Sequence, residues 1–196
     1  MVAGRKTVVG LGNPGAKYTG TRHNLGFEVL AELSRRHGGG RPAIQFDAEV
    51  VDIVIGDCRV LLQAPQTFMN LSGRSVRKMV DFYNLPLDDL LVVCDDLNLE
   101  PGRIRVRGGG SAGGQKGVAD IAVHLGTQEF PRLRLGIGRP PGRMDAAAWV
   151  LSRFRPQDRE EIDHAIVQAA DAVEIWCRDG LLEAMNRCNG SSSGDQ

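Results

Sequence analysis

The sequence predicts an α/β fold: a single three-layer α/β/α domain over residues 1–189, with a twisted, mixed and mostly parallel sheet between two layers of helices. Short apolar, β-branched runs alternate with helical patterns, which is typical of a sheet covered by helices on both faces. The pair Gly56-Asp57 separates two strand-like runs and indicates a hairpin, so the sheet is expected to be mixed. A length of 196 residues suits one domain, and no repeat or linker interrupts the pattern.

The first half of the chain begins with an apolar, β-branched run at residues 6–11 that is followed by glycine and predicts a strand. Leucine and valine then recur at helical spacing over 25–33, and three glycines mark the end of this helix. Residues 47–55 and 58–63 are the two strands of the hairpin. The stretch 72–83 predicts a helix because its apolar residues fall on one face.

The middle of the chain contains a continuous apolar run at 90–94, as expected of a central strand that is covered on both sides. Residues 103–107 alternate basic and apolar side chains, which predicts a strand with one positive, exposed face. A glycine-rich loop at 108–114, a short helix at 118–125 and a strand at 133–137 follow.

The last quarter of the chain is expected to be helical at 146–154, 156–178 and 181–187. Asp179-Gly180 ends the long helix. The segment 190–196 is polar and glycine-containing, and we expect a disordered tail there.

Composition points to an ordinary globular protein in the cytoplasm. Hydrophobic residues make up 42% of the chain and charged residues 24%. No apolar run approaches the roughly 20 residues that cross a bilayer, and residues 1–7 lack the apolar stretch of a signal peptide, so no membrane partner is expected. The four cysteines show no CxxC spacing. We therefore expect reduced, mostly buried thiols and no metal.

The charges are balanced overall but unevenly distributed. There are 24 basic and 24 acidic residues, which by itself argues against a nucleic-acid partner. From Met144 onward there are ten acidic and five basic residues. The stretch 103–143 has only two acidic residues but eight basic ones: Arg103, Arg105, Arg107, Lys116, Arg132, Arg134, Arg139 and Arg143. Charge alone leaves open whether these form a positive face or are scattered solubilising charges.

The run Gly10-Leu11-Gly12-Asn13-Pro14-Gly15 matches the glycine pattern of dinucleotide sites. In those sites the third glycine opens a helix directly, and an acidic residue ends a second strand about twenty residues on. Here residues 16–22 are polar and turn-like, and the first helix follows. We therefore expect no nucleotide cofactor, and a cofactor-binding oxidoreductase remains only a distant alternative.

His23 and Asp95 are the residues whose chemistry fits general-base catalysis. His23 lies in a polar loop past the first strand, and Asp95-Asp96 follow the apolar strand at 90–94. In open α/β sheets ligands bind at the carboxyl ends of the strands, and a carboxylate that binds one imidazole nitrogen strengthens the other as a base. Taken singly, a histidine after a turn is more often a loop cap or a surface residue, and an Asp-Asp pair after a strand is often a helix cap or a turn former. His37, His124 and His164 lie in helical patterns and are interpreted as structural or exposed.

Four long motifs in order resemble those of the bacterial-type peptidyl-tRNA hydrolase family, and the resemblance runs from about residue 7 to residue 189. The first is GLGNPGAKYTGTRHNLGFE, from Gly10 onward. The others are QTFMNLSG from Gln66, DDL from Asp95 with Pro101-Gly102, and FPRLRLGIG from Phe130.

The resemblance implies the hydrolysis, without metal or cofactor, of the ester that joins a peptide to its transfer RNA. His23 would activate water, Asp95 would orient it, and Asn13 would bind the peptide main chain and polarise the ester carbonyl. Six further residues fall at substrate-binding positions of the family: Tyr18, Phe68, Asn70, Asn24, Met69 and Lys116. Arg107 and Arg134 match the family's clamp for the transfer RNA phosphate, in a basic groove, and the loop 108–114 matches its mobile lid. We expect a monomer.

One position departs from the family pattern. After the lid glycines the family usually carries Gly-His-Asn-Gly, and this chain has Gly114-Gln115-Lys116-Gly117. Lys116 cannot accept a hydrogen bond, so either it binds an RNA phosphate or the activity is weakened. The alternative is therefore a non-catalytic RNA-binding protein on the same scaffold.

Overall fold

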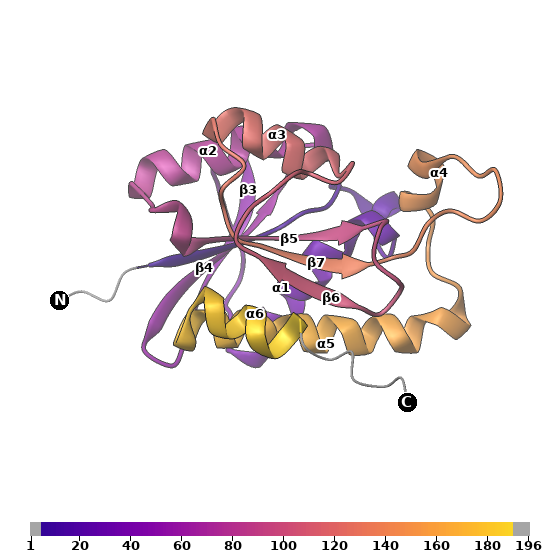
Figure 1. The fold of residues 1–196 in the computed structure, drawn as a ribbon. Helices are drawn as coiled ribbons and strands as arrows, with labels where there is room; N and C mark the ends of the chain where they lie inside the picture. The colour runs from indigo at the N-terminus through magenta and orange to yellow at the C-terminus, as the bar shows by residue number, and fades with distance from the viewer. Residues whose placement is uncertain (1–4, 190–196) are drawn as a thin grey trace.

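Seven strands form one sheet in the order β2-β3-β4-β1-β5-β7-β6 in the computed structural model, which describes residues 5–189 (Figure 1). The expected disordered tail, 190–196, lies outside the described residues. The strands are β1 (Lys6–Gly10), β2 (Ala43–Gln45), β3 (Ala48–Ile55), β4 (Cys58–Pro65), β5 (Leu90–Asp96), β6 (Ile104–Arg107) and β7 (Arg132–Gly136). The central strands β4, β1, β5 and β7 run parallel, and β3 and β6 run opposite to them.

Helices cover both faces of the sheet, which confirms the three-layer α/β/α prediction. In Figure 1, α2 and α3 lie above the sheet and α1, α5 and α6 lie below it. The helices are α1 (Leu25–Arg36), α2 (Ser72–Tyr83), α3 (Lys116–Leu125), α4 (Ala146–Val150), α5 (Pro156–Asp179) and α6 (Leu181–Asn189). Short 3-10 turns lie between them: η1 (Ala16–Tyr18), η2 (Arg22–Asn24), η3 (Met69–Leu71) and η4 (Leu87–Asp89).

The alternation of side chains along the strands divides the apolar core into two. In β5, Leu91 and Val93 pack with α1 and α5 on one face, whereas Leu90 and Val92 pack with α2 and α3 on the other. All seven residues of β5 are buried, as the continuous apolar run predicts.

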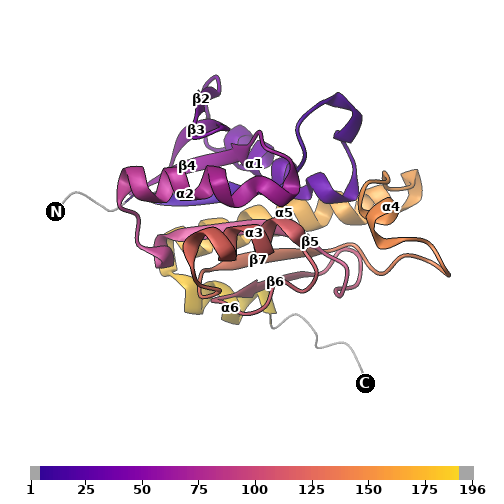
Figure 2. The same cartoon turned by 90° about the horizontal axis from the view of Figure 1, so that it is seen from above.

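The parallel pairing of β1 and β5 positions the loops that follow them. Val9 pairs with Val92 and Gly10 with Val93. Both strands therefore end at the same edge of the sheet, beside the segment that contains α4, and Figure 2 shows this edge from above.

Several element boundaries differ from the expected ones. Strand β2 was not predicted; its three residues are exposed and carry no burial pattern. Strand β5 continues through Asp95 and Asp96, and α3 begins at Lys116 rather than at 118. Helix α4 ends at Val150, not at 154, because Ser152 and Arg153 pair instead with Arg22 and Thr21.

The first glycine motif has the context expected of a loop rather than of a nucleotide site. Gly15 is followed by the short turn η1, and α1 begins only at Leu25. The motif does not lead directly into an α-helix, so its glycines shape a loop that presents Asn13.

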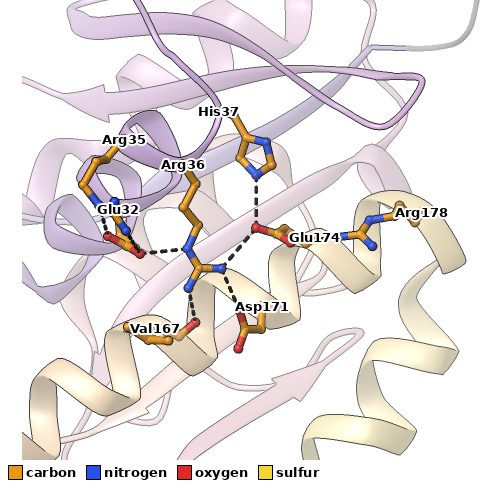
Figure 3. A network of polar contacts seen from close by, with 8 residues as sticks. All are labelled: Glu32, Arg35, Arg36, His37, Val167, Asp171, Glu174 and Arg178. Atoms are coloured by element: carbon orange, nitrogen blue, oxygen red, sulfur yellow. Dashed lines mark hydrogen bonds and ion pairs between the residues drawn. The ribbon is translucent and has the colours of Figure 1, made fainter.

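A network of polar contacts joins the carboxyl end of α1 to α5 (Figure 3). The guanidinium of Arg36 donates to Glu32 at 2.7 Å, to Asp171 at 2.6 Å, to Glu174 at 3.1 Å and to the main-chain oxygen of Val167 at 3.1 Å. The ring of His37 contacts Glu174 at 3.0 Å, so this histidine is structural, as expected. His124 and His164 are exposed.

Between residues 5 and 189, no helix is both long enough and apolar enough to cross a membrane. The four cysteines are free; Cys94 and Cys177 are buried, and Cys58 and Cys188 are half-buried. Burial raises the pKa of the Cys94 thiol to about 12. This thiol therefore remains protonated at neutral pH, which makes it a poor nucleophile.

Candidate active site

His23 and Asp95 form a buried pair at the carboxyl edge of the sheet. His23 lies in η2 and Asp95 near the end of β5. The Nδ1 atom of His23 is 2.9 Å from both carboxylate oxygens of Asp95. An ionised carboxylate can only accept, so Nδ1 carries the proton and Nε2 keeps its lone pair. This is the tautomer that a general base requires.

Two glycines bring His23 within reach of Asp95, because they let α1 lie directly on the main chain of the sheet. A Cβ atom at Gly26, in the first turn of α1, would lie 2.2 Å from the nitrogen of Leu11 and 2.7 Å from the carbonyl oxygen of Val93. A Cβ atom at Gly10 would lie 2.3 Å from the carbonyl oxygen of Gly26. Only hydrogen fits at either position, and this close approach fixes the start of α1 next to the end of β5.

Asn24 fixes the loop that carries Asn13. Its Oδ1 accepts from the main-chain N–H of Asn13 and its Nδ2 donates to the carbonyl oxygen of Asn13, both at 2.9 Å. The Asn13 side chain in turn accepts from the main-chain N–H of Met69 at 2.8 Å and so joins the loop to η3. No described residue accepts a hydrogen bond from the Asn13 Nδ2 atom, so its N–H groups can donate to a ligand.

A cavity of about 380 Å³ lies in front of this pair. It brings together most of the side chains that the sequence indicated. Apolar side chains of α4 and of the residue after it form one wall. The lining residues are Asn13, His23, Phe68, Met69, Asn70, Leu97, Gly114, Lys116, Ala146, Ala147, Val150 and Leu151.

The other predicted site residues do not line this cavity. Asp95 lies behind His23, and both ends of the Asn24 amide bind Asn13. Tyr18 is half-buried in η1, with the amine of Lys17 4.7 Å from its ring centroid. Arg107 is exposed on β6. The roles expected of these four residues remain predictions, and for Asn24 the observed contacts favour a role in holding Asn13.

Arg134 is not a free cation. Its guanidinium donates to Asp96 at 2.9 Å and to the main-chain oxygen of Ser111 at 2.6 Å. The neighbouring Arg132 is completely buried and donates to the carbonyl oxygens of Gly110, Ser111 and Gln128. Burial, and then the charge of Arg134, lower the pKa of Arg132 from its ordinary value. These two arginines therefore hold the glycine-rich loop 108–114 against β7.

Gln115 is a site residue to which the sequence analysis assigned no role, although Gln115 is part of the departure from the family pattern. It precedes α3, is buried, and donates from Nε2 to Asp95 Oδ1 at 3.0 Å. A polar residue just before a helical pattern suggests a helix cap, but that signal does not indicate contact with a carboxylate 20 residues earlier in the chain.

Arg22 is a second residue that the sequence did not reveal. Its guanidinium lies 3.6 Å from the ring centroid of Trp149 and 4.7 Å from that of Phe154. It also donates to the hydroxyl of Ser152 and to the main-chain oxygen of Arg153. Burial lowers the pKa of this arginine from its ordinary value. The segment that forms the apolar wall of the cavity is thus attached to the residue next to His23.

Within residues 5–189, no cluster of three or more histidine, cysteine, aspartate or glutamate side chains could hold a metal ion. What the described groups provide is a base oriented by a carboxylate, amide donors and an apolar wall. This set is suited to the attack of water on a carbonyl group.

Comparison with known proteins gives one consistent result. The sequence profile described as peptidyl-tRNA hydrolase matches residues 7–196. The peptidyl-tRNA hydrolase of Rhodopirellula baltica is 53% identical over 187 residues, which are 95% of this chain and 98% of that protein. The enzyme of Syntrophomonas wolfei is 47% identical over 184 residues, which are 94% of this chain and 100% of that protein.

Solved structures of peptidyl-tRNA hydrolases share the fold. The crystal structure of peptidyl-tRNA hydrolase from Acinetobacter baumannii superposes with a TM-score of 0.89 at 33% identity, and the match covers 97% of each chain.

Proposed function

The chain belongs to the peptidyl-tRNA hydrolase family, and from this we infer that the cavity beside His23 binds and hydrolyses the ester between a peptide and the terminal ribose of transfer RNA. The observation that carries the assignment to this cavity is the contact of His23 Nδ1 with Asp95 at 2.9 Å, at the bottom of a cavity lined by two asparagines.

The reaction needs one base and one set of amide donors. Nε2 of His23 takes a proton from water as the water oxygen attacks the ester carbonyl. The carbonyl oxygen becomes an oxyanion, to which the Nδ2 groups of Asn13 and Asn70 donate. The tetrahedral intermediate then expels the ribose oxygen, which takes the proton from the imidazolium of His23. Asp95 keeps the ring oriented and stabilises its transient charge.

The rim of the cavity suits the two ends of the substrate. The ring of Phe68 is 54% exposed and offers a face for the terminal base or for a peptide side chain. Lys116 is exposed and lines the same cavity, which suits a phosphate of the RNA better than the peptide amide. Arg107 and Arg134 would extend this contact along a basic groove to the transfer RNA phosphate. We propose a cytoplasmic monomer that needs no metal.

The decisive experiment compares the turnover of an N-blocked aminoacyl-tRNA by the wild type, His23→Ala and Lys116→Asn. We expect His23→Ala to lower kcat by at least about 100-fold, because general-base catalysis contributes that much or more. Lys116→Asn is expected to keep or raise the activity, since it restores an amide at the cavity. EDTA is expected to change none of these rates.

Binding of uncharged transfer RNA by His23→Ala serves as the control for folding. A non-catalytic RNA-binding protein would bind this RNA but release no amino acid even as wild type. Full activity of His23→Ala would remove His23 from the mechanism.

A further inference from the structure

Gln115 joins three parts of the site with one side chain. It is 8% exposed and occupies the N-cap position of α3. Its Oε1 accepts from the main-chain N–H of Val118 at 2.9 Å. Its Nε2 lies 3.0 Å from Asp95 Oδ1 and 3.3 Å from the sulfur of Met69.

The orientation of this amide follows from its partners. The N–H of Val118 can only donate, so the amide oxygen must face it. The NH₂ group is thereby directed at Asp95, whose ionised carboxylate can only accept. Asp95 Oδ1 thus receives two donors, the ring of His23 and the amide of Gln115.

We propose that Gln115 is a positioning residue for catalysis: it holds the Asp95 carboxylate in the plane that orients His23. The proposal rests on the function inferred above. A carboxylate that accepts two hydrogen bonds holds its rotamer better than one that accepts a single bond. The amide does not titrate, so this support persists across the pH range in which the enzyme works.

The same contact ties the glycine-rich loop to the reacting groups. Gln115 directly follows Gly114, and its main-chain N–H donates to the carbonyl oxygen of Ala112 at 3.1 Å. A Cβ atom at Gly117 would lie 2.6 Å from the sulfur of Met69 and 3.1 Å from Gln115 Oε1, so the side chain has little freedom to move. Gln115 therefore fixes the positions of the glycine-rich loop, the first turn of α3 and Asp95 relative to one another.

Two substitutions separate the hydrogen bond that Gln115 donates to Asp95 from its capping of α3 and from the volume it fills. Gln115→Ser keeps an N-cap oxygen for the N–H of Val118 but cannot reach Asp95. Gln115→Met keeps the length and volume but has neither the cap nor the donor. Gln157→Ser and Gln157→Met are matched controls, because Gln157 is an exposed glutamine in the first turn of α5, outside the site.

We expect both Gln115 variants to lower kcat by about tenfold or more, the size of the effect when one hydrogen bond to a charged group is lost. KM should change less than twofold, because Gln115 does not line the cavity. In a His23→Ala background the same substitutions should have no further effect.

Other outcomes identify other roles. A wild-type kcat in Gln115→Ser would show that the residue only caps α3, and a wild-type kcat in Gln115→Met would show that it only fills space. Either result overturns the proposal. If the wild type itself releases no amino acid from N-blocked aminoacyl-tRNA, the proposed function has failed, which is a distinct result.

Discussion

Single residues behind the cavity hold one another through hydrogen bonds to the main chain. Asn24 binds both main-chain groups of Asn13, and Asn13 binds the main-chain N–H of Met69. Because each of these groups is buried, the loop after β1 cannot move without leaving a polar group unpaired. The amide of Asn13 is thus set in place before a substrate arrives.

We predict that Asn24→Ala lowers both stability and activity. The N–H and C=O groups of Asn13 would remain buried without partners, which costs about 2–3 kcal/mol in the free energy of unfolding. The Asn13 amide would also lose its fixed position, so kcat should fall by about tenfold or more. Urea unfolding and hydrolysis of N-blocked aminoacyl-tRNA measure the two effects. An unchanged free energy of unfolding would show that the loop holds itself without Asn24.

The sequence predicts the chemically distinctive residues of the candidate site, but not the residues that hold them in position, such as Gln115 and Arg22. The positions of His23 and Asp95 follow from the rule that loops at the carboxyl ends of parallel strands converge. The contact of Gln115 with Asp95 and the stacking of Arg22 on Trp149 depend on the path of two loops across the sheet. No local pattern encodes such a path, because a capping glutamine and a loop arginine are common in any sequence.

At the scale of elements, the position of α1 depends on its contacts with α5. The network around Arg36 is the polar part of that interface, and Figure 3 shows its members converging on one guanidinium. Hydrogen bonds from Arg35 and Arg36 hold the pKa of Glu32 at about 2. Burial would raise the pKa of Glu174, but hydrogen bonds from Arg36 and His37 bring it below its ordinary value.

We predict that Arg36→Met destabilises the protein by about 2 kcal/mol at pH 7, because it leaves carboxylates of the half-buried network without their partner. The lowered pKa values mean that the network stabilises the fold above the ordinary value of 4.5, and that this contribution is lost as the pH falls toward about 2. The difference between variant and wild type should therefore shrink over this range. Urea unfolding at pH 7, 5, 4 and 3 measures it.

Arg35→Met is the matched control for this network. The side chain of Arg35 is 72% exposed, so water screens its bond with Glu32, and its loss should destabilise the protein much less than the loss of Arg36 does. An equal loss in both variants would mean that the contact between α1 and α5 contributes nothing beyond a surface ion pair.

The elements with a strong apolar period were predictable, and those shaped by long-range contacts were not. Strand β5 and helix α5 lie close to where the sequence places them. The apolar pattern near 146–154 suggests a longer α4, but the main-chain N–H of Arg22 binds the carbonyl oxygen of Ser152 and draws the chain out of the helix. Strand β2 has no alternation to reveal it, because it pairs only at the edge of the sheet.

On the whole molecule, the basic stretch at 103–143 contributes less surface charge than its count suggests. Arg132 is completely buried and Arg134 is bound to Asp96, so both act first within the fold. The other six basic residues of the stretch are exposed: Arg103, Arg105, Arg107, Lys116, Arg139 and Arg143. RNA binding at this surface should therefore depend on these six side chains rather than on all eight.

We predict that KM for N-blocked aminoacyl-tRNA rises with KCl concentration. Arg107→Ala should lower the slope of log KM against log KCl concentration by about 1, because one phosphate contact is lost. The kcat value at saturating substrate should remain unchanged, because Arg107 lies outside the cavity. Steady-state kinetics at four salt concentrations measure both quantities.

Arg59→Ala is the control for general charge effects. Arg59 is exposed near the amino end of β4, whereas the cavity lies at the carboxyl edge. A slope that changes equally in both variants would show that the RNA does not contact the surface around Arg107.

The contact between Gly10 and Gly26 has a consequence for how this reaction centre can be altered. Each glycine meets main-chain atoms at distances that no methyl group can occupy, and α1 starts two residues after His23. A methyl group at either position would push α1 away from the sheet, and His23, which lies two residues before α1, would move with the helix. A substitution at Gly10 or Gly26 would therefore change the position of the His23 ring, and with it the activity, by changing the distance between α1 and the sheet. No atom in contact with the substrate would be altered.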